Sequence, residues 1–416
     1  MKYGLLIHKP TSNLGDDIQS YAIERFLPQV DYLVDREWIH SFKSDKGEPV
    51  ATVMAAWWMR YKWAWPPSKD IYPLFVGWHY SDQAAAKQAG CPVGYDFLTG
   101  IGGKYLEAYG PVGCRDEYTL QSLKDKGIEA EFSGCITLTL PKQKKVPHER
   151  EYICLVDVSA KVEKYVRARL EGTDIDIKVI THDVDQKAYK TLQWSERSQI
   201  VEDTLTVYQN AKCVLTRRLH CALPCLAMGV PVLLVIHTLE SIRFDPYYDW
   251  LRCCKPEQYI SGEYDFDVLN PPDNKTNHLE TRRSLTRKVE EFIADTMNRD
   301  HPEELLKFHV PEKKVEKWRY KKMLSAAKTW YHVNRADREE IRDLQKTEKG
   351  SGRNRKQLSL LTEQEYFEEW EKFRKSLFLR TIPEKNQMLE QRMLVELRYM
   401  RKNYDEMKRL KNKLKK

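Results

Sequence analysis

Short apolar runs alternate with segments of helical period over much of the chain, and this alternation restricts the possible folds more than any other feature. In the second half the apolar runs are "YICLVDV" (152–158), "IDIKVITH" (175–182), "KCVLT" (212–216) and "VPVLLVIH" (230–237). Helical patterns over 198–211 and 219–229 separate the later runs. Strands that alternate with helices pair in parallel through right-handed crossovers. This half therefore predicts a Rossmann-like domain.

The first half of the chain repeats the pattern. The run "YGLLIH" (3–8) is followed by the turn "KPTSNLGDD" and a helical pattern over 18–27, and a further strand, helix and strand occupy 110–140. The segment "PKQKKVPHER" (141–150) is basic, contains two prolines and is interpreted as a linker. The predicted fold class is therefore α/β, with two Rossmann-like domains facing a cleft.

A different composition begins near residue 300. Residues 301–416 hold 31 Lys and Arg against 19 Asp and Glu, a net charge of +12 in a chain whose total is +8. The pattern there is helical and charged, and "KTEKGSGRNRKQ" (346–357) indicates a flexible break. The predicted domains are 1–141, 150–300 and a mostly α-helical, basic C-terminal extension over 301–416.

The end of this extension has an apolar repeat of seven residues. The repeat consists of Met393, Met400, Met407 and Leu414, and it is typical of a coiled-coil helix that could join two copies of the chain. Aromatic and basic residues, as in "KKVEKWRYKKMLSAAKTWYH" (313–332), leave binding to nucleic acid or to an anionic membrane open. Because acids are interspersed and no compact basic cluster is seen, we favour a solvated helical face that packs on the other domains or self-associates.

Targeting signals are not evident in the sequence. The first residues, "MKYGLLIHKPTSNLGDD", reach Lys9 and Pro10 before an apolar core of signal-peptide length develops. No apolar run attains the roughly 18–20 residues that cross a bilayer. The nine cysteines are scattered and lack C-x-x-C spacing, which favours free thiols in a reducing compartment. We therefore expect a cytoplasmic protein without a transmembrane segment.

The stretch "VLTRRLHCALPCLAMGVPVLLV" (214–235) places charged residues between apolar runs. Arg217, Arg218 and His220 lie where a buried strand ends and a helix begins. Ligands of open α/β sheets bind at this edge, and a helix N-terminus with two guanidinium groups favours a phosphate or carboxylate. His220 could exchange a proton there. The same pattern also fits a loop arginine paired with a carboxylate and a partly buried histidine.

Other strand ends also carry polar residues. Gly15 and Asp16 follow the first strand in "NLGDDIQSYA", where the backbone could approach a ligand closely. Arg115 precedes a helix in "GPVGCRDEYTLQSL", and His79 ends a strand in "FVGWHYSD". The aromatic segment 51–82 fits a loop held by core aromatics and a loop that contacts substrate equally well. Each motif is weak alone, but their order along an α/β chain indicates a shared site.

Residues of about 1–300 resemble the polysaccharide pyruvyl transferase family. The resemblance is carried by "NLGDDIQSYA", "GPVGCRDEYTLQSLKDKGI" with "FSGCITLTL", the block "WPPSKDIYPLFVGWH" and, most specifically, the R-L-H triplet of "YQNAKCVLTRRLHCALPCLAMGVPVLLV". It implies a GT-B-like arrangement and transfer of the group derived from phosphoenolpyruvate onto sugar hydroxyls of a glycan or its precursor, often as a pyruvate ketal. The N-terminal domain would take the acceptor and the C-terminal domain the donor anion.

The resemblance also implies roles for single residues. Arg218 would grip the donor anion, His220 would act as general acid or base, and Arg115 would complete the donor site. Asp16 matches the N-terminal G-D motif, whose role is less defined. A basic residue that the family tends to have about twenty positions after the histidine is matched by Arg243.

The sequence departs from the family at one place and leaves other functions open. Ala55 and Ala56 stand where the family tends to have a polar Asn-Gly pair, which puts the acceptor or the activity in question. Arg217 lies outside the triplet and would contact substrate or be only a structural neighbour. No metal or other cofactor is implied, because His and Asp are not clustered at ligand spacing and arginines can neutralise an anion. The alternatives are a GT-B-type glycosyltransferase that uses a nucleotide-sugar, and a non-catalytic glycan-binding scaffold with a helical assembly tail.

Overall fold

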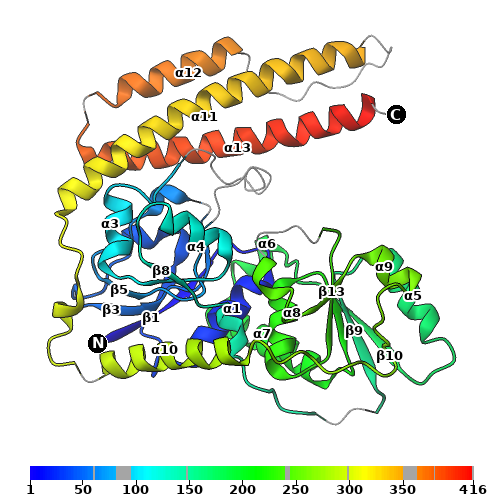
Figure 1. Cartoon of the computed structure of the whole chain (residues 1–416). Coiled ribbons are helices and arrows are strands. Elements are labelled where there is room, and N and C mark those ends of the chain that lie inside the picture. The colour runs from blue at the N-terminus through cyan, green and yellow to red at the C-terminus, as the bar shows by residue number, and fades with distance from the viewer. Residues whose placement is uncertain are drawn as a thin grey trace. The chain divides into compact units, whose positions relative to one another are not determined.

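The computed structural model describes residues 1–59, 61–80, 95–146, 149–238, 244–297, 299–349, 363–378 and 380–414. The chain divides into two compact units (Figure 1). Unit 1 comprises Met1–Trp58, Pro67–Tyr80 and Tyr105–Phe308. Unit 2 comprises Met59–Pro66, Ser81–Lys104 and His309–Lys416.

The first half of unit 1 contains a four-stranded parallel sheet in the order β2-β1-β3-β5. Its strands are β1 (Lys2–Ile7), β2 (Tyr32–Asp35), β3 (Val50–Val53) and β5 (Ile71–Leu74). Five of the six residues of β1 are buried, as expected for a parallel strand covered on both faces, and this explains an apolar run without alternation. Ile7 pairs with Asp35, so β1 and β2 end at the same edge of the sheet.

Two small parallel pairs and two helices complete this half. The pairs are β4 (Trp57–Trp58) with β6 (His79–Tyr80), and β7 (Val112–Cys114) with β8 (Ala130–Phe132). The two helices are α1 (Leu14–Glu24) and α4 (Glu117–Lys124). The residues of a third helix, α3 (Ile101–Ala108), are divided between unit 1 and unit 2. Asn13 caps α1 and Asp116 caps α4. Arg115 and Asp116 separate the end of β7 from the start of α4, and α1 begins after the loop that follows β1.

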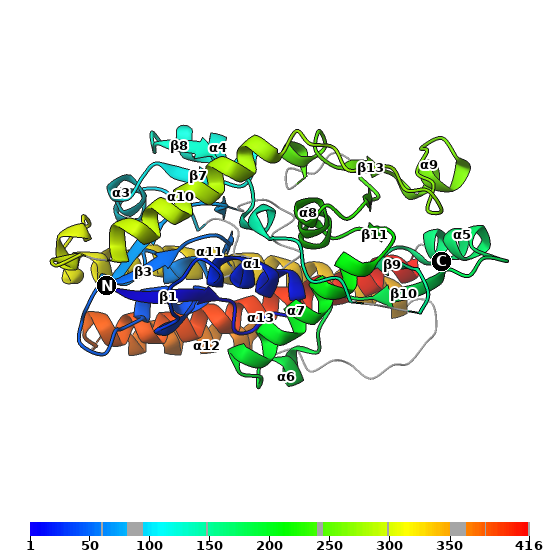
Figure 2. The same ribbon diagram turned by 90° about the horizontal axis from the view of Figure 1, so that it is seen from below.

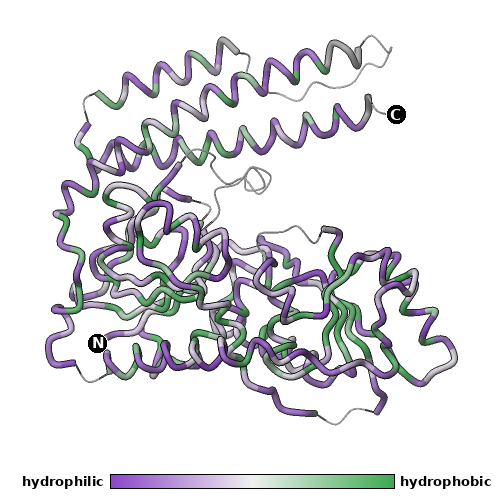
Figure 3. Tube along the Cα trace, in the orientation of Figure 1, coloured by the Kyte–Doolittle hydropathy of each residue, from purple (hydrophilic) through white to green (hydrophobic). Residues whose placement is uncertain are grey.

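The second half of unit 1 contains a five-stranded parallel sheet in the order β10-β9-β11-β12-β13. Its strands are β9 (Tyr152–Val156), β10 (Asp176–Ile180), β11 (Val214–Thr216), β12 (Val232–Val235) and β13 (Arg252–Cys254). Figure 3 shows the central strands as the most hydrophobic part of this half. The strand order reverses between β9 and β11, and doubly wound sheets bind ligands at such a reversal.

The helices of this half connect its strands and join it to the first sheet. They are α5 (Ala160–Arg169), α6 (Gln186–Tyr189), α7 (Trp194–Asn210), α8 (Leu219–Met228) and α9 (Pro256–Ser261). Helix α8 ends at Gly229, whose left-handed φ of 76° stops the helix as the sequence predicted. Helix α1 packs against α7 and α8 (Figure 2), and one core cluster contains Leu5 of the first sheet and Val214 of the second. The two halves of unit 1 therefore share a core.

Helix α10 (Leu279–Met297) follows the second sheet in sequence but packs on the first half. The hydroxyls of Tyr3 and Thr296 lie 3.3 Å apart, and the ring of Phe292 stacks on Tyr72 with centroids 5.2 Å apart. The chain thus returns to the first sheet after completing the second. The domain boundaries predicted from the sequence stay predictions.

Unit 2 contains three long helices, α11 (Glu312–Lys349), α12 (Glu363–Ser376) and α13 (Ile382–Leu414). Ion pairs join Arg319 to Glu390 near the start of α11 and α13, and Glu340 to Lys411 near their ends, so these two helices run parallel. Helix α12, which lies between these two helices in the sequence, runs in the opposite direction. Its Trp370 stacks on Tyr331 of α11 with ring centroids 4.8 Å apart. The predicted helical extension is therefore an up-down-up bundle.

The apolar stripe of α13 faces α11 within the same chain. Helices α11 and α13 pack together along their length, and Met393, Leu397, Met400 and Leu410 are buried. This packing accounts for the seven-residue repeat without a second copy of the chain. Self-association through the stripe stays a prediction.

The aromatic segment 51–82 provides core residues. Trp58, Trp63, Trp65 and Trp78 are all fully buried. Trp63 belongs to unit 2, where it meets Trp330 edge to face and its carbonyl oxygen accepts a hydrogen bond from Nε of Arg319 at 3.0 Å. The structure thus supports the interpretation of core aromatics for these tryptophans.

The predicted α/β class, with two Rossmann-like parallel sheets and a helical C-terminal region, is confirmed. Among the described residues, no helix combines the length and the hydropathy needed to cross a membrane. The eight cysteines in the described part of the chain are all free thiols, and seven of them are buried.

Candidate functional site

A cavity of about 310 Å³ lies at the strand reversal of the second sheet. It is lined by Asn13, His182, Arg217, Arg218, Leu219, His220 and Phe244. The register pairs Val156 of β9 with both Ile180 of β10 and Thr216 of β11, so the loops after these three strands meet at one edge. Asn13 comes from the loop after β1. The cavity therefore lies where the two halves of unit 1 meet.

Arg218 is held by two carboxylates. Its Nε donates to Asp157 at 2.7 Å and its Nη2 to Asp183 at 2.7 Å. Burial alone would lower the pKa of Arg218, but these two hydrogen bonds raise it above its ordinary value. Asp157 has a left-handed φ of 53°, rare for a residue with a side chain, and it also accepts the backbone N–H of His182. Arg218 thus matches the alternative of a loop arginine paired with carboxylates.

Arg217 differs from its neighbour. Its side chain is exposed and lines the cavity, and it forms no ion pair with any residue that the structure describes. The sequence-based interpretation gave Arg218 the donor anion and left Arg217 as either a substrate contact or a structural neighbour. The structure shows the opposite distribution of available positive charge, because the carboxylates of Asp157 and Asp183 already balance Arg218.

His220 meets Arg115 from the other half of unit 1. Nη1 of Arg115 lies 3.4 Å from Nε2 of His220 and 3.4 Å from the side-chain oxygen of Gln19. An arginine can only donate, so Nε2 accepts and a neutral His220 carries its proton on Nδ1. Arg115 is fully buried, its Nε and Nη2 have no hydrogen-bond partner among the described residues, and Tyr247 donates to its carbonyl oxygen at 2.7 Å. Two predicted catalytic residues are thus in contact.

Gly15 adjoins the other side of the His220 ring. A Cβ atom added at Gly15 would lie 2.9 Å from Nδ1 and 3.0 Å from Cβ of His220, closer than real side chains approach. Any larger residue would therefore displace the imidazole. The sequence identified Gly15 as a point of close approach, and the structure shows that the approaching group is His220.

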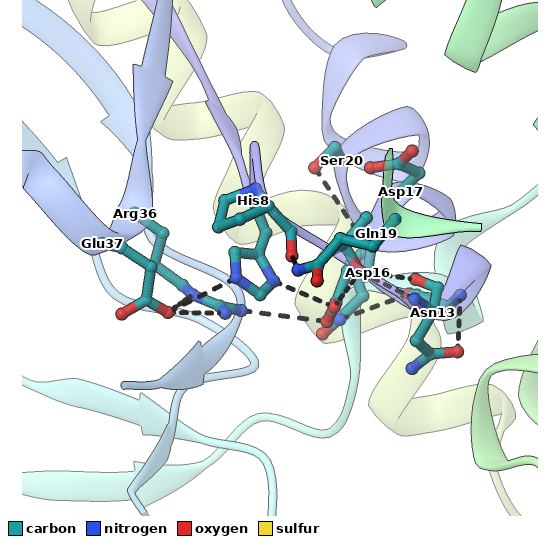
Figure 4. Close-up of polar contacts among 12 residues, drawn as sticks. His8, Asn13, Asp16, Asp17, Gln19, Ser20, Arg36 and Glu37 are labelled. Carbon is teal, nitrogen blue, oxygen red and sulfur yellow. Dashed lines mark hydrogen bonds and ion pairs between the residues drawn. The ribbon is translucent and has the colours of Figure 1, made fainter. Parts of the chain in front are cut away.

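Asp16 belongs to a polar network at the ends of β1 and β2 (Figure 4). Nδ1 of His8 lies 3.1 Å from the carboxylate of Asp16, and the hydroxyl of Thr11 donates to the same carboxylate at 2.7 Å. The guanidinium of Arg36 lies 3.8 Å from this carboxylate and also donates to Glu37. Burial opposes ionisation of Asp16, but the hydrogen bond and charge of His8, with the charge of Arg36, hold its pKa well below the usual range. The carboxylate of Asp16 therefore organises the loop after β1 and does not line the cavity.

His79 does not line the cavity either. It is buried, and its Nδ1 bonds the carboxylate of Asp116, which also caps α4 through the N–H of Thr119 at 2.9 Å. Burial raises the pKa of Asp116, but the charge and hydrogen bond of His79 outweigh it and lower the pKa overall. Because Asp116 follows Arg115 in the chain, this pair fixes the backbone beside the site.

Two further predictions concern Arg243 and the pair Ala55 and Ala56. Arg243 lies outside the described residues. Ala55 and Ala56, which stand in place of the Asn-Gly pair, are buried after β3.

The sequence reasoning missed several residues of the site. Asp157, His182 and Asp183 follow directly after β9 and β10, so the rule that flagged Arg217 could have found them. Gln19 could not be found in this way, because it lies inside a helix. No group of three or more His, Cys, Asp or Glu in the described part of the chain is placed to hold a metal ion.

His182 is a cavity residue whose ionisation is strongly perturbed. It is fully buried, and its Nε2 lies 2.8 Å from the hydroxyl of Tyr208. Burial, assisted by the charge of Arg218 and opposed by that of Asp157, lowers its pKa from 6.5 to about 4. The folded protein therefore resists protonation of His182 in a pH range where the unfolded chain accepts the proton.

We expect this difference to make stability depend on pH. The contribution is fully present above the unfolded pKa of 6.5 and is lost as the pH falls towards the folded value of about 4. The expected loss is on the order of 3 kcal/mol. Urea unfolding of the wild type and of His182→Gln at a series of pH values gives the free energy of unfolding as a function of pH. The contribution of His182 is the difference between the slopes of these two curves. Equal slopes would show that His182 is not the group responsible.

One known protein family matches the part of the chain that contains this site. The family model described as polysaccharide pyruvyl transferase matches residues 13–238. The chain belongs to the polysaccharide pyruvyl transferase family. The match covers more than half of the chain and includes Gly15, Arg115 and the R-L-H triplet, whereas the helices of unit 2 lie outside it. Membership indicates a transferase that moves pyruvyl groups onto glycans.

The solved structures that resemble this pyruvyl transferase are distant from it in sequence. One is the Methanocaldococcus jannaschii UDP-GlcNAc 2-epimerase in complex with UDP-GlcNAc and UDP, at 11% identity over 69% of this chain and 99% of that chain, with a TM-score of 0.33. Another is S. aureus MnaA in a co-structure with UDP, at 11% identity over 74% of this chain and 91% of that chain, with a TM-score of 0.30. No curated protein matches the chain.

Proposed function

We propose that this pyruvyl transferase takes its group from phosphoenolpyruvate and closes a pyruvate ketal on two hydroxyls of a sugar in a glycan or its precursor. One observation carries the proposal. His220 lines a cavity together with the exposed Arg217, and its Nε2 contacts Arg115, which lies 105 residues away in the sequence. A proton carrier beside cationic groups is the combination that an enol phosphate donor requires.

The proposed chemistry consists of two additions at C2 of the donor. Protonation of the methylene carbon makes C2 electrophilic, and the first sugar hydroxyl adds there and loses its proton. Phosphate then leaves with the electron pair of the C2–O bond, and the second hydroxyl adds to close the ketal. Of the two protons that the hydroxyls lose, one balances the proton gained by the methyl group and the other leaves with phosphate.

His220 is suited to the protonation step. Because Arg115 donates to Nε2, the proton of the neutral ring lies on Nδ1. This atom lies close to Gly15, where any side chain would collide with the ring. Delivery of a proton requires the imidazolium form of the ring, since a neutral ring that lost its proton would become an imidazolate. In the proposal, His220 in this form protonates the methylene carbon and Arg115 positions the ring.

The two adjacent arginines take different parts in the proposal. Arg217 would bind the phosphate or carboxylate of the donor, since it lines the cavity and its charge is not balanced by a described carboxylate. Arg218 would instead hold the loops after β9 and β10 together through Asp157 and Asp183. This division reverses the roles expected from the triplet.

Phosphoenolpyruvate binding tests this division of roles between Arg217 and Arg218. We expect millimolar phosphoenolpyruvate to raise the unfolding temperature of the wild type. Arg217→Gln should weaken donor affinity about tenfold to a hundredfold, the value of a lost charge-assisted hydrogen bond, with little change in the unfolding temperature of the free protein. Arg218→Gln should destabilise the free protein by about 1–3 kcal/mol, because it leaves two carboxylates without their partner.

A matched control is Arg167→Gln, which removes an exposed arginine paired with Glu163 on α5. It should alter neither affinity nor stability measurably. If phosphoenolpyruvate leaves the wild type unchanged while a nucleotide-sugar stabilises it and is consumed, the donor assignment is wrong. If Arg218→Gln lowers affinity and Arg217→Gln does not, the division of the arginines is wrong.

A further inference from the structure

Unit 2 has a small groove where the start of α11, the end of α12 and the start of α13 come together. The groove has a volume of about 230 Å³, and Tyr320, Leu324 and Leu377 provide its apolar surface. Leu377 is buried and anchors the end of α12. The three helices thus form an apolar depression that does not belong to the site in unit 1.

The rim of this groove is cationic. Lys328, Arg374 and Lys385 line it, one from each helix. Arg374 pairs with Glu371 at 2.9 Å, but neither lysine forms an ion pair with any residue in the described part of the chain. The Nζ atom of Lys385 lies 5.8 Å from the ring centre of Tyr320. Positive charge therefore surrounds the apolar surface.

The sequence around the groove reinforces this charge. Residues 372–385 contain five Lys and Arg against a single acid, Glu384, and that glutamate is engaged by Arg380 and Thr381. The N-terminal part of α12 is acidic by contrast, with four glutamates between 363 and 369. The basic end of α12 is thus a local feature and not a property of the whole helix.

Phe378 is the most exposed large apolar residue of the described chain. It lines the groove just beyond α12, and 84% of its surface is accessible. A phenylalanine in this position costs solvation free energy unless something covers it. An aromatic ring that protrudes between lysines and arginines matches the interface of an anionic bilayer, where rings lie at headgroup depth and cations contact phosphates.

Other occupants fit these observations less well. The groove is built from helices, whose backbone groups are already bonded, so it offers no strand edge to an extended peptide. A single exposed ring is also less than the series of stacking platforms that single-stranded nucleic acid uses.

We propose that the groove around Phe378 binds the surface of an anionic lipid bilayer. Phe378 inserts at the interface, and Lys328, Arg374 and Lys385 contact lipid phosphates. This interaction would bring the transferase to glycans or precursors held at a membrane, and it is independent of the chemistry at His220.

Vesicle sedimentation with the full-length protein tests the proposal. We expect binding to vesicles of phosphatidylcholine with phosphatidylglycerol, weak binding to phosphatidylcholine alone, and loss of binding at high salt. The double variant Lys328→Glu and Lys385→Glu should lower the partition coefficient at least about tenfold, since each cation near the surface contributes a factor of about five. Phe378→Ser should also lower it several-fold.

Matched variants separate the groove from general charge and hydrophobicity. Phe367→Ser changes an exposed phenylalanine of α12 that does not line the groove, and Lys402→Glu changes an exposed lysine of α13 that does not line it either. Both should bind vesicles like the wild type, with unchanged circular dichroism. The proposal is overturned if the wild type ignores phosphatidylglycerol, if the groove variants bind normally, or if soluble polyglutamate binds the groove and vesicles do not.

Discussion

His220→Gln is expected to lower kcat for pyruvyl transfer by about 10²–10⁴-fold, the usual value of a positioned acid or base. The variant keeps a hydrogen-bonding side chain of similar size but removes the group that carries the proton. The buried guanidinium of Arg115 contacts the ring at 3.4 Å, so the same loss is expected from Arg115→Met. Release of phosphate from phosphoenolpyruvate, measured with a glycan fraction that supports the wild type, gives the rate.

The controls distinguish chemistry from general damage. His278→Gln removes another buried histidine of unit 1 that does not line the cavity, and its rate should stay close to that of the wild type. Gly15→Ala should reduce the rate without removing any charge, because its Cβ would displace His220. A His220→Gln enzyme with normal kcat would rule out His220 as the proton carrier.

Asp17→Asn is expected to lower the free energy of unfolding by about 3–5 kcal/mol, since it leaves a buried arginine without its countercharge. Both side chains of the pair are almost fully buried, and Nε of Arg197 on α7 donates to Asp17 on α1 at 2.8 Å. Tyr189 donates to the same carboxylate at 2.6 Å. Arg197 also bonds the carbonyl oxygen of His8, so the pair joins the two halves of unit 1. Urea unfolding at neutral pH measures the loss.

Two comparisons make this test specific. Glu163→Gln breaks an exposed pair with Arg167 and should cost at most about 0.5 kcal/mol. Replacing both partners, with Asp17→Leu and Arg197→Met, should recover much of the loss because no buried charge is left unpaired. A loss from Asp17→Asn no larger than that of Glu163→Gln would show that the pair contributes little to the shared core.

The part of the candidate site that could be predicted from the sequence consists of residues that follow strand ends. In a parallel sheet every strand ends at the same edge, so polar residues directly after Thr216 and Ile7 had to lie near a ligand-binding edge. This reasoning identified Arg217, Arg218, His220 and Gly15. Applied to β9 and β10, it would also have identified Asp157 and His182.

The same rule cannot divide roles among neighbours. Arg217 and Arg218 are adjacent and identical in type, yet one is exposed in the cavity and the other is fixed by Asp157 and Asp183. His79 and Asp16 were also expected at strand ends, but His79 begins β6 and Asp16 lies in α1. Both are held by local networks and do not line the cavity. Partners distant in sequence decide these outcomes, and local pattern does not contain them.

By itself, the sequence determined the class of fold, the order of strands and helices, the family and the edge of the sheet where the candidate site lies. These properties follow from apolar periodicity and from residues at strand ends, which are local. Only the tertiary structure placed Arg115 against His220, turned the stripe of α13 onto α11 and grouped Trp63 with the helical unit. The reason is that contacts between segments far apart in sequence depend on packing of the whole core, which no short stretch of sequence specifies.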